Sequence, residues 1–231
     1  MLARRARDGR RTDPSDVATD GRLARSVGTR AAVADAMLAL IEAGDLRPTA
    51  PRIAERAGVS LRSVFQHFPD LDTLFAAVAD RQTERIRALL QRIPPQRPLA
   101  ERLAAFVAQR VRVLEMIAPV RRAALLMAPV SPEIARRLEG ARTIARTEVE
   151  RVFARELAAC DATARSEWLA ALDVASGWST WESLRTHHGL PVERAHRVVT
   201  RMLTTLLEGA GRSRPATHPK RRKHGNLAHA R

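Results

Sequence analysis

The sequence predicts an all-α protein, and three observations support that prediction. Apolar residues recur three and four residues apart through most of the chain between residues 29 and 208, which is the spacing of an α-helix. Glycines and prolines fall between these segments. No stretch alternates apolar and polar residues for long enough to form a β-strand. The chain of 231 residues can bury a core without disulfides, and its one cysteine, Cys160, excludes an internal disulfide framework.

The formal net charge of +15 indicates an anionic partner of some kind. Charge alone does not distinguish nucleic acid from an anionic membrane or an acidic protein. No apolar run approaches the ~20 residues that cross a bilayer, and the N-terminus lacks the apolar segment of a secretory signal. We therefore expect no transmembrane helix and no secretory signal.

Both ends of the chain are polar and basic. Residues 1–25 contain seven arginines and four aspartates, and we expect them to form a disordered basic arm. Residues 211–231 contain seven basic residues and no acidic one. They have too few large apolar side chains to offset the entropy cost of ordering, so they predict a disordered basic tail. The run Lys220–Lys223 favours sequence-independent attraction to DNA, with a nuclear-localisation signal or a membrane patch as alternatives.

The first compact segment begins with two predicted helices. The first helix ends at Gly44, and its apolar stripe is Val33, Ala36, Met37, Leu40 and Ile41. The second is short: Thr49 is a good N-cap, Pro51 is tolerated in the first turn, and Gly58 ends the helix.

A third helix follows directly after Gly58, with Ser60 as its N-cap. We expect it to bury Val64, Phe65 and Phe68 and to end at Pro69. Two helices joined by a tight glycine turn form a helix-turn-helix, whose second helix can lie in the major groove of DNA. The outward residues of this second helix are Ser60, Arg62, Ser63, Gln66 and His67.

Residues 49–68 resemble the DNA-binding signature of TetR-type transcriptional regulators. The matching residues are Thr49, Ile53-Ala54, Ala57-Gly58-Val59-Ser60, Phe65 and His67-Phe68, followed by Asp70-Leu71-Asp72-Thr73-Leu74-Phe75 as a fourth helix opens. The resemblance covers about residues 29–80. It implies a helix-turn-helix DNA-binding domain over residues 26–75 and a larger α-helical effector-binding and dimerisation domain over residues 76–210.

The chain departs from that family at two positions. Phe65 replaces a tyrosine whose hydroxyl commonly touches a phosphate, and Leu71 replaces a lysine. Residues 29–75 carry five basic and six acidic residues, a net charge of −1. Affinity for the DNA backbone therefore has to come partly from other segments, such as Arg22 and Arg25, which could reach an adjacent minor groove.

Arg62 is the best candidate for reading a base, because a guanidinium can bind guanine O6 and N7 together; a phosphate contact is the alternative. Gln66 suits adenine or a phosphate. Ser60 favours capping over reading. The predicted DNA-binding set is Thr49, Arg52, Ser60, Leu61, Arg62, Ser63, Phe65, Gln66 and His67.

The remainder predicts four further helices. After the linker at residues 94–98, one helix should run from about Leu103 to a point before Pro119. Ser131-Pro132-Glu133 is a strong start signal for the next, which should continue to about residue 159. The last two should span about residues 164–185 and 192–208.

The last two helices carry apolar residues on more than one face, which suits a two-fold four-helix interface. The predicted dimer residues are Trp168, Leu172, Ala175, Trp181, Val199, Met202, Leu203 and Leu206. The resemblance also implies a pocket for a small-molecule effector. Its candidate lining residues are Phe106, Met116, Met127, Trp168 and Trp178.

Nothing in the sequence indicates an enzyme. The chain has no GxGxxG, P-loop, HExxH or GxSxG motif, and His187-His188 lacks a second ligand pair at metal-binding spacing. We expect no catalysis, metal or cofactor. The resemblance implies a homodimeric repressor that binds a palindromic double-stranded DNA operator and leaves it when an effector binds. It also implies a nucleoid-associated protein of a bacterial-type cytoplasm with no membrane partner. A low-specificity nucleoid-like DNA-binding protein and a transcriptional activator are the alternatives.

Overall fold

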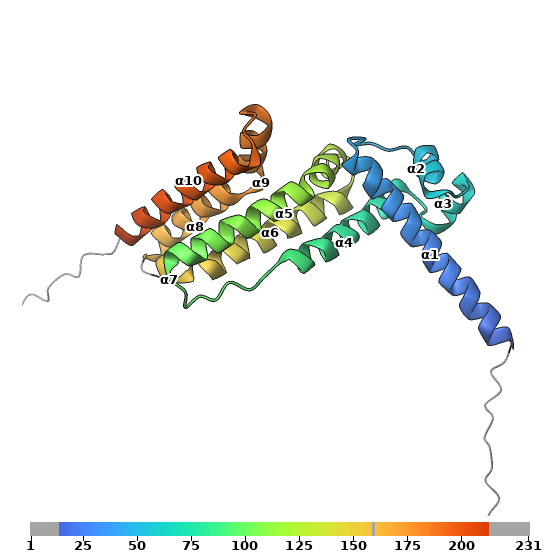
Figure 1. Cartoon of the computed structure of the whole chain (residues 1–231), viewed down its shortest axis with the longest axis horizontal. Helices are drawn as coiled ribbons and strands as arrows, with labels where there is room; N and C mark the ends of the chain where they lie inside the picture. Colours follow the sequence, from blue (N-terminus) through green and yellow to red (C-terminus); the bar gives the residue numbers. More distant parts are fainter. Residues whose placement is uncertain (1–13, 159, 213–231) are drawn as a thin grey trace, which may run out of the picture. The chain divides into compact units, whose positions relative to one another are not determined.

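The computed structural model describes residues 14–158 and 160–212, and all the regular secondary structure in these ranges is helical (Figure 1). The prediction of an all-α protein is confirmed. The elements are α1 (Pro14–Glu42), α2 (Ala50–Ala57), α3 (Leu61–His67), α4 (Leu71–Leu89), α5 (Leu99–Met127), α6 (Pro132–Val152), α7 (Ala154–Leu157), α8 (Ala162–Ser176), α9 (Trp178–Glu182), the π-helical turn η1 (Ser183–His187) and α10 (Val192–Arg212).

Internal contacts divide the chain into two compact units. Of the described residues, the first comprises 14–90 and 113–141, and the second comprises 91–112, 142–158 and 160–212. Helices α5 and α6 each contribute residues to both units. The domains predicted from the sequence, residues 26–75 and 76–210, are defined by function rather than by contacts and stay a prediction.

One hydrophobic core holds the first unit together. Helices α1, α2, α3 and α4 supply most of it, and the end of α5 and the start of α6 complete it. The side chains with almost no exposed surface include Val33, Ile41, Ile53, Val64, Phe68, Leu74, Val78, Ala123 and Ile134. The apolar stripes predicted for the first four helices therefore meet in one place, and this common core fixes α2 and α3 against α1.

Helix α1 begins earlier than the sequence suggested. It starts at Pro14, within the arm that was expected to be irregular as far as residue 25. A proline in the first turn removes no intrahelical hydrogen bond, and a helix already anchored by its buried stripe extends at little cost per residue. Residues 1–13 of the predicted arm and residues 213–231 of the predicted tail lie outside the described residues.

Three predicted helix ends are wrong. Helix α5 continues through Pro119 to Met127, where the burial of Ala118, Val120 and Ala123 outweighs the proline's missing donor. The helix that starts after Ser131 ends at Val152 instead of continuing to residue 159. The helix expected over residues 164–185 is broken at Gly177, where a Cβ would lie 2.9 Å from the carbonyl oxygen of Asp173.

The second unit contains a buried ion pair at the start of α5. Arg102 is only 2% exposed and makes two hydrogen bonds to Glu156, at 3.0 and 2.6 Å. Its guanidinium also donates to the backbone carbonyls of Arg97 and Val152. One turn further along α5, the ring of Phe106 packs edge-on against that of Phe153, with centroids 5.2 Å apart. Polar and aromatic contacts thus join α5 to the end of α6 and to α7.

Helices α8 and α10 pack against each other in the same unit (Figure 1). The approach is close at Gly209, where a Cβ would lie 2.7 Å from the Trp168 ring. No helix among residues 14–158 and 160–212 is apolar over a length that would cross a membrane.

Asp70 caps α4, as the sequence predicted. Its carboxylate accepts a hydrogen bond from the backbone N–H of Thr73 at 2.6 Å, and this bond lowers the pKa of Asp70 below its usual 3.8. A carboxyl whose pKa is lowered by folding stabilises the folded state above its unfolded pKa and loses that contribution as pH falls through its folded pKa.

We therefore expect Asp70→Ala to lower the free energy of unfolding at neutral pH and to have less effect in acid. Urea denaturation of both proteins from pH 7 down to pH 3 measures the difference. A difference that does not depend on pH would show that the charge of Asp70 contributes nothing to the cap.

Candidate nucleic-acid interface

The turn between α2 and α3 has the geometry that a helix-turn-helix requires. Gly58 lies in the left-handed region, with φ 67° and ψ 32°. Its N–H donates to the carbonyl of Glu55 at 3.1 Å, and the N–H of Val59 donates to that of Ala54 at 3.0 Å. These two bonds form a Schellman motif, which ends α2 and redirects the chain. A side chain with a Cβ is strained at this φ, so the glycine predicted from the sequence is needed here.

Helix α3 is held from its start and from its inner face. The hydroxyl of Ser60 accepts a hydrogen bond from the N–H of Ser63 at 3.1 Å, which confirms the predicted N-cap. Val64 and Phe68 lie four residues apart and are both 1% exposed. Their burial leaves the opposite side of α3 turned to solvent.

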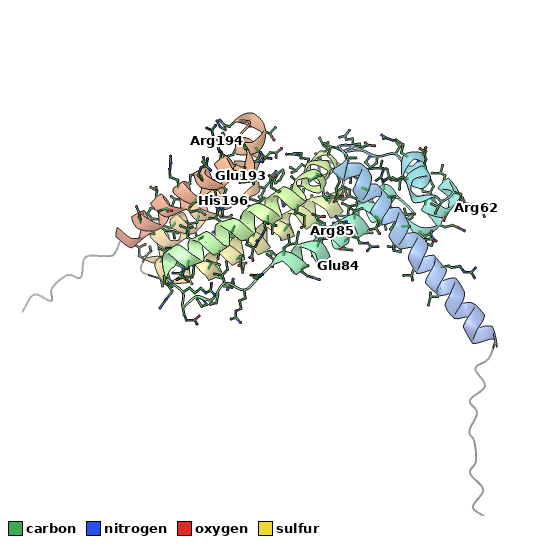
Figure 2. The ribbon with its side chains drawn as sticks, in the orientation of Figure 1. Arg62, Glu84, Arg85, Glu193, Arg194 and His196 are labelled. Atoms are coloured by element: carbon green, nitrogen blue, oxygen red, sulfur yellow. The ribbon has the colours of Figure 1, made fainter. Side chains whose placement is uncertain are left out.

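The exposed side of α3 carries Arg62 and Gln66, which are four residues apart and so project from one face. Arg62 extends from α3 into solvent (Figure 2). Leu61 is also exposed, and Ser63 and His67 are half-buried. Arg62 makes no ion pair within the described part of the chain, so its guanidinium keeps its donors for a ligand.

The exposure of Phe65 contradicts the sequence prediction. The sequence predicted that its ring would be buried with Val64, but the ring is 48% exposed. Successive residues of a helix are separated by 100°, so Val64 and Phe68 take the inward positions and Phe65 falls beside the polar face. An exposed aromatic ring next to Arg62 and Gln66 is available to DNA, although it lacks a hydroxyl for a phosphate.

The two predicted contacts at the start of α2 differ in their surroundings. Thr49 occupies the N-cap position, but its side chain makes no capping hydrogen bond. Arg52 is paired with Asp45, with 2.5 Å between Nη1 and Oδ2. Binding of Arg52 to a phosphate would therefore compete with an existing ion pair.

One cation near α3 could not be predicted from the sequence. Arg30 of α1 donates from Nη1 to the backbone carbonyl of His67 at 2.6 Å, and its guanidinium lies over the ring of Phe68. Arg30 and His67 are 37 positions apart, so no local sequence pattern predicts their contact. The only sequence signal was the position of Arg30 at the start of the apolar stripe of the first helix.

The residues predicted for an effector pocket fall in both units. Met116 and Met127 belong to the first, and Phe106, Trp168 and Trp178 to the second. Phe106 is fully buried against Phe153, whereas the other four are half-buried. A shallow hollow of about 240 Å³ lies elsewhere in the second unit and is lined by Leu190, Arg194, Arg197, Val198 and Arg201. The predicted pocket stays a prediction.

Most of the residues predicted for dimerisation are in the core of their own chain. The buried ones are Leu172, Ala175, Trp181, Val199 and Leu203. Trp168 and Leu206 are half-buried, and Met202 is exposed. Of the predicted set, only Trp168, Leu206 and Met202 have solvent-accessible surface that a partner chain could bury. A dimer through α8 and α10 would therefore have to use other residues of these helices as well.

Comparison with known proteins supports the fold. No family model matches the chain, and no curated protein matches it in sequence. Among solved structures, the chain is similar to a transcriptional regulator from Rhodococcus sp. Rha1, with a TM-score of 0.62 and 21% sequence identity. The match covers 79% of this chain and 97% of that regulator. The protein therefore shares its all-helical fold with a transcriptional regulator.

Proposed function

We propose that this protein is a sequence-specific DNA-binding transcriptional regulator of the TetR type. One observation carries the proposal: α3 follows a Schellman turn, is anchored by Val64 and Phe68, and presents Arg62 and Gln66 on its free face. A helix presented in this way fits the major groove, where arginine and glutamine side chains can distinguish bases. The likeness of the fold to a transcriptional regulator supports the same conclusion. Such a protein would act on DNA in a bacterial-type cytoplasm.

A homodimer suits this function, because two copies of α3 can then reach half-sites about one helical turn, ~34–36 Å, apart. The exposed stripe of α8 consists of small or short side chains and one acid: Thr163, Ser166, Glu167, Ala170 and Val174. The outer face of α10 carries Arg194, Arg197, Arg201 and one acid, Glu208 (Figure 2 labels Arg194). The net positive charge of this face disfavours contact between two α10 faces, so α8 packing against the partner's α10 is the better pairing.

We expect Val174→Arg to weaken this dimer, raising its dissociation constant by about 100-fold or more, because it would place a further cation against the arginines on the partner's α10. Val174 is 67% exposed in the single chain, so the change should not affect folding. Ile144 is 70% exposed on α6 and provides a matched control, Ile144→Arg. Sedimentation velocity over a concentration series measures both, and an unchanged dimer in Val174→Arg would place the interface elsewhere.

Release by a small-molecule effector is the third part of the proposal. Helices α5 and α6 run through both units without a break at the unit boundary, and their residues Val120, Ala123 and Ile134 belong to the core that holds α1 and α4. A ligand that displaces these helices would therefore act on the core beneath the helix-turn-helix. It would shift the population towards a state that does not bind DNA.

Selection of bound duplexes from a random DNA pool tests the proposed function. A palindromic consensus is expected, because two-fold symmetry of the protein imposes it on the site. The alternative is a low-specificity DNA-binding protein, favoured by the net charge of −1 over residues 29–75 and the seven basic residues in 211–231. That alternative predicts no consensus and equal affinity for all duplexes at every salt concentration. Whether the regulator represses or activates depends on where the site lies relative to a promoter.

A further inference from the structure

Arg30 joins α1 to the C-terminal end of α3 by two contacts of different kinds. Its Nη1 donates to the backbone carbonyl of His67, the last residue of α3, at 2.6 Å. Its Cζ lies 4.3 Å from the centroid of the Phe68 ring, a cation–π distance. Phe68 itself is 1% exposed and sits in the core of the first unit. The guanidinium is thus held between a fixed ring and the end of α3.

Helix α3 needs support of this kind because it has only seven residues. Isolated helices of that length are not stable in water, so contacts with the rest of the unit decide where α3 lies. The carbonyl of Val64 accepts from the N–H of Phe68, but the carbonyls after it in the last turn lack such a partner, and a positive charge there is favourable. Ser60 holds the start of α3, Val64 holds its inner face, and Arg30 holds its end.

We infer that Arg30 is a positioning residue for DNA recognition: it fixes the end of α3 and thereby the direction in which Arg62 and Gln66 project. The inference rests on the proposed function and adds a residue outside the helix-turn-helix to the determinants of sequence choice. Gln66 is next to His67, and Arg62 lies five residues before it, less than two turns of helix. A small displacement of that end would therefore move both side chains relative to base edges, which bind only over a narrow range of geometry.

The chemistry of the guanidinium explains why arginine is suited to this position. A planar guanidinium can stack on a ring and donate a hydrogen bond in its own plane at the same time. A lysine ammonium carries the same charge but cannot reproduce both contacts. A simple phosphate contact, in contrast, would be largely preserved by lysine. Arg30→Lys therefore separates a positioning role from a purely electrostatic one.

Three variants and two duplexes form the test. The variants are Arg30→Gln, Arg30→Lys and the control Arg87→Gln, which removes one exposed charge from α4 in the same unit. The duplexes are one selected by the wild-type protein from a random pool and one of the same composition in shuffled order. We expect both Arg30 variants to lose about tenfold in the ratio of the two affinities, with an unchanged salt slope, and Arg87→Gln to keep the wild-type ratio.

Hydrogen exchange without DNA provides a second readout. If Arg30 holds the end of α3, amides near Val64 and Phe68 should exchange faster in both Arg30 variants while those in the middle of α1 keep their protection. Faster exchange throughout the unit would indicate general destabilisation and would overturn the positioning role. If Arg30→Gln does not fold, Arg30→Lys decides.

Three further outcomes also count against the inference. An equal loss for both duplexes in Arg30→Gln, restored by Arg30→Lys, would make Arg30 a phosphate contact. A wild-type protein that does not distinguish the two duplexes would refute the proposed function itself, and the inference with it. Discrimination by the wild type that persists in both Arg30 variants would overturn the inference alone.

Discussion

Glu156→Ala is expected to lower the free energy of unfolding by about 3–5 kcal/mol, the typical cost of leaving one member of a buried ion pair without its partner. Arg102 is 2% exposed, and Glu156 accepts two of its hydrogen bonds. The remaining bonds to the carbonyls of Arg97 and Val152 satisfy donors but do not balance the charge. The loss should appear in urea or thermal denaturation as a cooperative transition at lower denaturant or temperature.

Glu150→Ala is the matched control for this prediction. Glu150 pairs with Arg165 at 2.8 Å, but the two side chains are 43% and 47% exposed, and solvent-exposed pairs contribute about 0–1 kcal/mol. The double variant Arg102→Met with Glu156→Leu should recover most of the loss, because it removes both charges and keeps the volume. Equal effects of Glu156→Ala and Glu150→Ala would show that the Arg102 pair is not desolvated in solution.

The second large effect is expected at Arg62. Arg62→Ala should reduce the preference for a selected site over shuffled DNA by about 1–3 kcal/mol, roughly 5- to 150-fold, because a bidentate contact to guanine would be lost. Arg62 is exposed on the free face of α3 and makes no ion pair or side-chain hydrogen bond with residues 14–158 or 160–212. The melting temperature should therefore stay at the wild-type value. Fluorescence anisotropy with both duplexes over a salt series measures the preference.

Arg56→Ala provides the comparison for Arg62. Arg56 is an exposed arginine of α2 without an ion pair in the described ranges, and it lies outside α3. Its loss should affect both duplexes alike or neither. If Arg62→Ala also weakens both duplexes equally and lowers the salt slope by about one, Arg62 contacts a phosphate and another residue reads the bases.

Local signals predicted the first four helices well. Gly58, Ser60 and Asp70 each act through the backbone within three to five residues, so their roles as turn and caps could be assigned without knowledge of the tertiary structure. The apolar stripe of the first helix was right for the same reason, since a period of 3.6 residues defines one face. Helix ends in the later part were harder. At Pro119 the burial of neighbouring side chains outweighs a local breaker signal, and burial depends on the whole unit.

In the candidate DNA interface, too, some side chains could be placed from local signals and others only from the packing of the unit. Arg62 and Gln66 could be placed on one face of a helix from their spacing, and the structure puts both in solvent. Phe65 could not be placed, because a helix of seven residues with three apolar side chains nearby allows more than one inward register. Only the packing of Val64 and Phe68 against α1 and α4 selects the register that exposes the Phe65 ring.

The sequence by itself determined the all-α class, the glycine turn and the caps of α3 and α4, because each depends on backbone geometry and on periodicity within a few residues. The tertiary structure alone decided the partners of three arginines. Arg52 forms an ion pair with Asp45, Arg102 forms one with Glu156, and Arg30 donates a hydrogen bond to the carbonyl of His67. An arginine side chain is long and has five donors, so many partners are compatible with its sequence position. The fold selects one of them by bringing distant segments together.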